Sequence, residues 1–557
     1  MFKPLLIHKD NTPIQNVFDT SNSIEFDTDS FDFRNSDLDT FITTGFIPKV
    51  ENKEFNIIFI KDNLSDNYLE LYGIILAYHI RLSPELKEKR YVPIIIISDI
   101  DGYILNKLDN LANILFTKNT FIGQNNVSTY DYYKKVFDIL PKFTDFKKEF
   151  LDKIVVEQPK DYLTHHDIAN EWSIHTWAKF LKIKDSPVID NNREKISSML
   201  YFKYLLAKYP VQDGSKISFA PKRPQSTGKI LYIDDQWKEG WSEIFEEYYS
   251  KTPDIKFNTF EYEYKDMNVD NFLNELRVQL KSSMPDMILL DLRLTKKDHE
   301  ETNHDQLTGI KILNIIEEIN KGIQVVMFTA TTQSGILEKL YDKGILGYIQ
   351  KEHPDRTQLN MKDTFLKFKS LTDSAFEKSY LKKIWTIQEK ILMLDFFNDT
   401  DNEKIEEIEF EVRSIFEVLN SQLHNQFVFS MLAIFKCIEI LVTMFIEEKR
   451  VNYSRHAYWI KTGEKIGNFK RNEYYPHSTS DEDKNDSTIN KIRILIYEKF
   501  NIQDEDTHDI LSAFTKRRNS AIHPKQHQQE LPITEEEILE WFKVLCKILQ
   551  SYNKLTN

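Results

Sequence analysis

Three short apolar runs near the middle of the chain restrict its fold most, because each of them ends in polar residues. Residues 230–235, 287–292 and 325–330 are rich in isoleucine, leucine, valine and methionine, which predicts buried parallel strands. The carboxyl ends of parallel strands meet at one edge of a sheet, where α/β proteins place their sites. A fourth run, residues 346–351, ends in a lysine. The sequence therefore predicts three carboxylates, a hydroxyl and an ammonium on one rim.

These polar residues suit a phosphoryl group held beside Mg²⁺. Asp291 ends the central strand and is the candidate phosphoacceptor. Asp234 and Asp235 are the candidate metal ligands, because Mg²⁺ is a hard cation that binds carboxylates. Lys351 would add a fixed positive charge for the phosphoryl oxygens, and the Thr329 hydroxyl could donate to the same oxygens.

The order of these strand ends, Asp-Asp, Asp, Thr-Ala and Lys, resembles the receiver domain of two-component response regulators. The resemblance implies a doubly wound, five-stranded parallel sheet and phosphorylation of Asp291 by a histidine kinase. It also implies that the backbone carbonyl of Arg293 binds the metal and that Tyr348 changes rotamer on activation.

Two features depart from the pattern of that family. Glu352 follows Lys351 where the family usually has proline. The loop of residues 295–308 is longer than usual and acidic. We expect this loop to restrict kinase docking, or to slow phosphorylation through like charge.

An N-terminal segment repeats the spacing of the central one. It has predicted strands at 55–60, 92–97 and 114–116 and a predicted helix at 69–82, whereas residues 1–50 show little periodicity. In this repeat Lys61 takes the place of Asp291, Ser98 that of Thr329, and Lys118 that of Lys351. We interpret the segment as a degenerate receiver-like copy that kept the fold and lost the chemistry. The alternative is an unrelated α/β unit.

The predicted fold class is multidomain α/β plus all-α. Its parts are a degenerate receiver-like unit (1–125), a helical connector and linker (126–227), a receiver domain (228–370) and a helical bundle (371–557). The net charge of −14 argues against nucleic-acid binding by the whole surface. Two cysteines, Cys437 and Cys546, predict buried thiols in a cytoplasmic protein. No signal peptide is expected, and the apolar stretch 427–446 predicts a core helix, since charged residues interrupt it.

A second motif lies near the C-terminus, where Arg518, Asn519 and His523 fall at the end of a predicted helix. A capping box at 534–537 opens a further helix. This arrangement resembles the HEPN domain, a helical bundle that is usually dimeric. The resemblance implies a metal-independent endoribonuclease in which Arg518 and His523 act on RNA and Asn519 supports them. The alternative is that Arg518 pairs with a nearby carboxylate and His523 is a surface residue.

Two functions follow from these features. The first is a response regulator phosphorylated on Asp291 that controls a HEPN-like ribonuclease, as in bacterial defence against phage. The second is a non-enzymatic regulatory or scaffold protein whose receiver and helical domains mediate dimerisation and partner binding. Both predict a histidine kinase or other protein partner, a homodimer and no membrane span.

Overall fold

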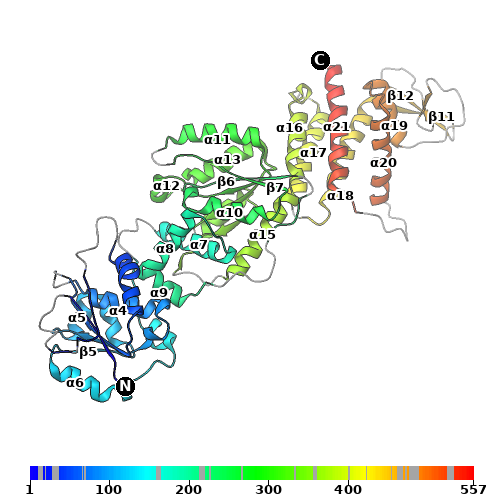
Figure 1. The fold of residues 1–557 in the computed structure, drawn as a ribbon. Helices are drawn as coiled ribbons and strands as arrows, with labels where there is room; N and C mark the ends of the chain where they lie inside the picture. Colours follow the sequence, from blue (N-terminus) through cyan, green and yellow to red (C-terminus); the bar gives the residue numbers. More distant parts are fainter. Residues whose placement is uncertain are drawn as a thin grey trace.

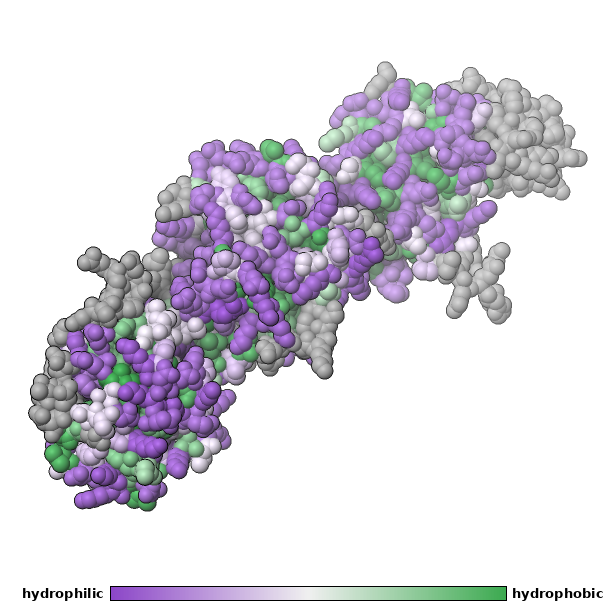
Figure 2. Space-filling view, in the orientation of Figure 1, coloured by the Kyte–Doolittle hydropathy of each residue, from purple (hydrophilic) through white to green (hydrophobic). Residues whose placement is uncertain are grey.

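The computed structural model describes residues 1–9, 17–18, 20–27, 37–65, 67, 70–158, 165–211, 220–224, 227–264, 267–330, 334–354, 360–398, 402–421, 423–452, 455–460, 468–470, 473–475, 488–522 and 532–556. Two α/β units and a helical region follow one another in a row (Figure 1). On the face shown in Figure 2, hydrophilic side chains cover most of both α/β units. The predicted fold class, α/β units followed by a largely helical region, is confirmed.

The first unit is built on an all-parallel sheet with the order β2-β1-β3-β4-β5. Its strands are β1 (Pro4–His8), β2 (Ser23–Glu25), β3 (Ile57–Lys61), β4 (Ile94–Ile97) and β5 (Thr120–Gly123). Its helices are α2 (Leu38–Thr40), η1 (Phe41–Phe46), α3 (Ile47–Glu51), α4 (Tyr72–Leu82), η2 (Pro84–Tyr91), α5 (Gly102–Leu108), η3 (Asn110–Phe116) and α6 (Val127–Val136). Alternate strand residues pack into cores on opposite faces of the sheet.

The prediction of a strand at 114–116 was wrong. These residues belong to the 3₁₀ helix η3, and the fifth strand is β5, which begins four residues later. Lys118 therefore precedes the fifth strand, and its Nζ pairs with Glu149 at 2.7 Å. Lys118 does not occupy the position of Lys351.

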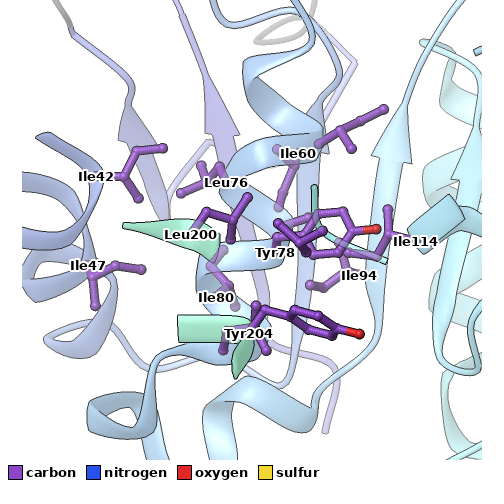
Figure 3. Packing of buried hydrophobic residues seen from close by; sticks show 14 of the residues in the cluster. Ile42, Ile47, Ile60, Leu76, Tyr78, Ile80, Ile94, Ile114, Leu200 and Tyr204 are labelled. Atoms are coloured by element: carbon purple, nitrogen blue, oxygen red, sulfur yellow. The ribbon is translucent and has the colours of Figure 1, made fainter. Parts of the chain in front are cut away.

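The connector consists mainly of α7 (His165–Leu181), α8 (Pro187–Ser198) and α9 (Leu200–Lys208). Helix α9 packs on α4, and Figure 3 shows Leu200 and Tyr204 of α9 beside Tyr78 and Ile80 of α4. Helix α7 contributes Ile168 to the core of the first unit and other residues to the core of the second. The connector is thus part of both cores. The linker predicted over 213–228 lies mostly outside the described residues.

The central unit has a second all-parallel sheet with the order β10-β9-β8-β6-β7. Its strands are β6 (Gly228–Ile233), β7 (Ile255–Thr259), β8 (Met287–Leu290), β9 (Gln324–Thr329) and β10 (Gly347–Gln350). Its helices are α10 (Trp241–Ser250), α11 (Val269–Ser283), α12 (Lys296–Glu300), α13 (Thr308–Asn320), α14 (Ser334–Asp342) and α15 (Met361–Glu377). Helices α10 and α15 cover one face together with α7, and α11, α13 and α14 cover the other. The strand order is the same as in the first unit.

The C-terminal region is a helical bundle with two short antiparallel strand pairs. Its helices are α16 (Tyr380–Leu392), α17 (Glu403–Asn420), α18 (Gln426–Phe445), α19 (Thr488–Ile494), α20 (Glu505–Ile522) and α21 (Glu535–Thr556). The strand pairs are β11 (Ile446–Asn452) with β12 (Arg455–Ile460) and β13 (Asn468–Lys470) with β14 (Glu473–Tyr475). Aromatic and β-branched residues in this stretch favour strands, whereas we expected an all-helical bundle.

Helix α18 is the apolar helix predicted from residues 427–446. By length and composition it is the one helix among the described residues that could cross a membrane, with a mean hydropathy of 2.1 and 50% of its apolar window buried. It packs against α17, α20 and α21 in the bundle. Both cysteines are buried and free, as expected.

Candidate functional site

Strand register brings the three predicted carboxylates together. Ile233 of β6 pairs with Leu290 of β8, so Asp234 and Asp291 follow their strands side by side. The Asp291 amide also donates to the Ile233 carbonyl at 2.9 Å. One carboxylate oxygen from each of Asp234, Asp235 and Asp291 lies within 4.8 Å of the others. This is the spacing of ligands around a single metal ion.

Lys351 closes the rim from the end of β10. Its amide donates to the Thr329 carbonyl at 2.9 Å. Its ammonium lies 2.8 Å from Asp234 Oδ2 and 3.2 Å from Asp291 Oδ2, and the side chain is 1% exposed. Burial alone would lower the pKa of Lys351, but the two carboxylates outweigh burial and raise it. Lys351 therefore remains charged at the site.

The carboxylates are crowded and poorly solvated. Burial is the main cause that raises the pKa of Asp234, against the effect of Lys351. Burial, followed by the charges of Asp234 and Asp291, raises the pKa of Asp235 to about 8. Backbone amides supply some compensation, since Gln236 N donates to Asp234 at 2.9 Å and Leu292 N donates to Asp291 at 2.6 Å. When all three carboxylates are ionised, the Lys351 ammonium alone does not neutralise them, and a divalent cation would supply the missing positive charge.

A small cavity of about 20 Å³ opens onto these groups, which is enough room for one water-sized or ion-sized occupant. Its lining is mostly polar and consists of Asp235, Gln236, Asp291, Arg293, His299, Thr329, Ala330 and Lys351. The oxygen-rich donor set and the excess negative charge fit Mg²⁺ or a similar hard cation.

The other predicted residues lie close by. Thr329 is 2% exposed, ends β9 and lines the cavity. Tyr348 is half-buried on β10, and the Lys367 ammonium lies 3.9 Å from the centre of its ring. Glu352, which stands where the family has proline, is buried and accepts a hydrogen bond from Thr364 Oγ1 at 3.1 Å. The pKa of Glu352 is raised to about 7 by burial.

The acidic loop after Asp291 is folded onto itself around Asp298. This carboxylate is 3% exposed. It accepts hydrogen bonds from the amides of Leu294, Thr295 and Thr308 at 2.9–3.0 Å and from Thr308 Oγ1 at 3.1 Å. Asp298 also forms a capping box with Thr295 at the start of α12. It therefore orders the loop, a role that sequence reasoning missed although Thr-x-x-Asp is a recognisable cap.

The first unit has the same backbone at the equivalent positions. Gly73 N donates to the Asp62 carbonyl at 2.9 Å, as Gly309 N donates to the Leu292 carbonyl at 3.1 Å. A Cβ on Gly73 would lie 1.9 Å from the Lys61 carbonyl oxygen, and one on Gly309 would lie 2.8 Å from that of Asp291. Gly73 of α4 thus packs against the end of β3, and Gly309 of α13 packs in the same way against the end of β8. This makes Lys61 the equivalent of Asp291.

The side chains at those positions invert the charge of the site. The ladder pairs of β1 with β3 match those of β6 with β8, so His8 and Lys9 stand where Asp234 and Asp235 stand. Lys61 replaces Asp291 and is held 3.4 Å from both Asp62 and Asp99. The register of β5 places Asn125 at the position of Lys351. This rim lacks the carboxylate set that a metal and a phosphoryl group require, because basic and amide side chains occupy it.

Comparison with known proteins agrees with that inversion. The family described as "Inactive Receiver domain" matches residues 10–123. The first unit resembles an inactive receiver. Among solved structures, the chain is similar to the signal receiver domain of a protein described as a Luxo repressor from Vibrio parahaemolyticus, with 20% identity over 28% of this chain and 97% of that chain and a TM-score of 0.18. It is also similar to NtrX from Brucella abortus, with 10% identity over 75% of this chain and 80% of that chain and a TM-score of 0.16. No curated protein matches the chain. The prediction that the N-terminal copy kept a receiver fold without its chemistry is in line with the inactive receiver match.

The C-terminal candidate residues are only partly described. Arg518 Nη2 lies 3.3 Å from Glu439 Oε1 of α18, and its guanidinium lies over the Phe435 ring at 4.7 Å. Asn519 is exposed and accepts from Arg518 Nη1 at 3.2 Å. His523 lies outside the described residues. Arg518 thus ties α20 to α18, and the ribonuclease assignment stays a prediction.

Proposed function

We propose that this protein is a non-enzymatic regulator whose central unit accepts a phosphoryl group on Asp291 in the presence of Mg²⁺. The observation that carries the proposal is the contrast between two matching backbones. The central rim holds three carboxylates within 4.8 Å and a buried lysine between two of them, whereas the inactive receiver unit holds basic residues there. The central unit is suited to accept phosphate, and the first unit serves as a scaffold.

In the proposed reaction a carboxylate oxygen of Asp291 attacks the phosphorus of a phosphohistidine or a small acyl phosphate. The new O–P bond forms as the bond to the donor breaks, and the donor leaves with that electron pair. Asp234, Asp235, Asp291 and the Arg293 carbonyl would hold Mg²⁺, which supplies charge neutralisation. Lys351 offers its ammonium to the phosphoryl oxygens, and Thr329 offers its hydroxyl.

The proposed setting is a cytoplasmic pathway with a histidine kinase as donor. In this proposal the inactive receiver unit and the helical bundle bind protein partners or a second copy of the chain. Helix α7 contributes to both α/β cores, so a change at the central rim would reach the first unit through packed side chains.

Phosphorylation of the full-length protein with acetyl phosphate and Mg²⁺ tests this function. We expect one hydroxylamine-labile phosphoryl group, mapped to Asp291 by mass spectrometry. Asp291→Asn should abolish it, and addition of EDTA should suppress it. Asp62→Asn, at the end of the matching strand in the first unit, is the control and should leave labelling unchanged. A wild-type protein that gains no label would overturn the proposal.

A further inference from the structure

Arg293 has an unusual environment two residues after the phosphoacceptor. It lines the cavity that contains Asp291, Thr329 and Lys351. Its Nε and Nη1 atoms are buried, and neither has a hydrogen-bond partner among the described residues. A guanidinium stays charged in proteins and carries five donors, so buried donors without acceptors are costly.

Arg81 and Arg517 differ from Arg293, because their Nη atoms have acceptors and only Nε of Arg81 is buried without a partner among the described residues. The Nη atoms of Arg81 donate to the carbonyls of Arg90, Val92 and Asn119 at 2.6–2.7 Å. Arg517 forms a bidentate ion pair with Glu537, with donor–acceptor distances of 2.9 and 3.0 Å. Those arginines have structural roles, whereas Arg293 lines a cavity beside Asp291 and keeps two buried nitrogens without acceptors among the described residues.

The surrounding chain holds Arg293 at this place. Leu292 and Leu294 on either side are 0% and 1% exposed and belong to the core under α13. Asp298, the nearby buried carboxylate, is occupied by four donors of its own loop. His299 also lines the cavity, and its pKa is lowered first by burial and then by the charge of Arg293. The guanidinium is therefore a second cation at the rim.

We propose that the Arg293 side chain binds the phosphoryl oxygens on Asp291. It thereby favours the phosphorylated site over the site that holds only a metal ion. This inference rests on the proposed function. A guanidinium matches phosphate geometry with paired donors. Before phosphorylation its positive charge opposes Mg²⁺ binding, because it lowers the net negative charge of the rim. The same residue thus weakens the metal and strengthens the phosphoryl group.

These opposite effects make the test specific. Full-length wild type, Arg293→Gln, Arg293→Ala and Arg293→Lys are compared by Mg²⁺ titration calorimetry and by beryllofluoride binding in saturating Mg²⁺. In Arg293→Gln and Arg293→Ala we expect tighter Mg²⁺ binding, and beryllofluoride binding weakened roughly tenfold, the size of a charge-assisted hydrogen bond. Arg293→Lys should restore most of the wild-type Mg²⁺ affinity, since it restores the charge.

The outcomes separate this inference from the proposed function. If wild type binds beryllofluoride and both neutral variants bind it equally well, the role of Arg293 is wrong and the proposed function stands. If Mg²⁺ and beryllofluoride both weaken together, Arg293 merely holds the loop and the inference is also wrong. If wild type binds no beryllofluoride, both the proposed function and the role of Arg293 fail. Circular dichroism identifies a variant that is misfolded, and Arg293→Gln keeps most of the native volume for that reason.

Discussion

Trp172 and Trp177 lie on the same helix, α7, but they pack into different hydrophobic cores. Trp172 stacks on Phe202 of α9 with 6.4 Å between ring centroids, in the core of the first unit. Trp177 lies 4.6 Å from the Phe365 ring of α15 in the core of the central unit. Neither α/β unit can move away from α7 without exposing a buried indole.

This relationship predicts separate effects of two matched mutations. Trp177→Ala should destabilise the central unit by about 3–5 kcal/mol, and Trp172→Ala should destabilise the first unit by a similar amount, because each leaves a cavity in one core. Urea denaturation followed by hydrogen exchange and mass spectrometry assigns the loss to a unit. Val278→Ala, on an exposed position of α11, is the control. Equal effects of both tryptophan mutations on both units would contradict the division into two cores.

The crowded carboxylates predict that stability depends on pH and metal. The pKa of Asp235 is raised to about 8 by burial and by Asp234 and Asp291, against about 3.9 in an unfolded chain. Between these values the folded state binds more protons than the unfolded state, so without metal stability should fall as the pH rises from about 4 to about 8. Mg²⁺ should remove most of this loss.

Thermal melts in EDTA and in Mg²⁺ across this pH range check the expectation. Asp235→Asn should flatten the dependence in EDTA and reduce the gain from Mg²⁺. Asp342→Asn, on an exposed position of α14, should leave both unchanged. An unaltered slope in Asp235→Asn would show that another group is responsible.

The two matching glycines predict effects of the same kind in different units. Gly73→Ala should destabilise the first unit by about 1–3 kcal/mol or more, since the new methyl would meet the Lys61 carbonyl. Gly309→Ala should destabilise the central unit and also weaken Mg²⁺ binding, because it presses on the Asp291 backbone. Gly335→Ala has open space around it and should cost nothing. Denaturation and Mg²⁺ titration distinguish the three, and loss of metal binding in Gly73→Ala would argue against a site confined to the central unit.

The environment of Arg518 predicts a structural effect rather than loss of a nuclease activity. Arg518→Ala removes a half-exposed ion pair with Glu439 and a contact over Phe435, so the bundle should lose about 1 kcal/mol. We expect no RNA cleavage that depends on this residue. Cleavage that disappears in both Arg518→Ala and His523→Ala, but persists in Lys516→Ala, would instead establish the ribonuclease.

The residues of the central site could be predicted from the sequence because the patterns that mark them are local. Buried parallel strands leave long apolar runs, and the polar residues after 233, 290, 328 and 350 stand out against them. The order of those ends is enough to place Asp234, Asp291 and Lys351 on one rim.

The first unit was harder to predict because its edge strands are short and carry weak patterns. Strand β5 has one buried residue in four, whereas the neighbouring apolar stretch ending at Phe116 forms a 3₁₀ helix. Strand β1 is only five residues long and precedes a segment with no periodicity. Sequence spacing placed Lys61 opposite Asp291, but the positions of His8 and Lys9 became visible only when ladder pairs fixed the register. The buried donors of Arg293 have no sequence signal at all.

Helix α13 contacts Asp291 at its start and helix α16 of the bundle at its end. Its second residue, Gly309, abuts the backbone of Asp291, and its last residue, Asn320, donates to the Lys382 carbonyl of α16 at 3.1 Å. Lys382 in turn pairs with Asp286 at 2.6 Å, and the neighbouring Gly322 leaves no room for a Cβ against Leu381. Asp291 and the start of the helical bundle are thus joined by one helix about 20 Å long. A small tilt of α13 at Asp291 would therefore shift α16 sideways, because the last residue of α13 contacts α16 directly.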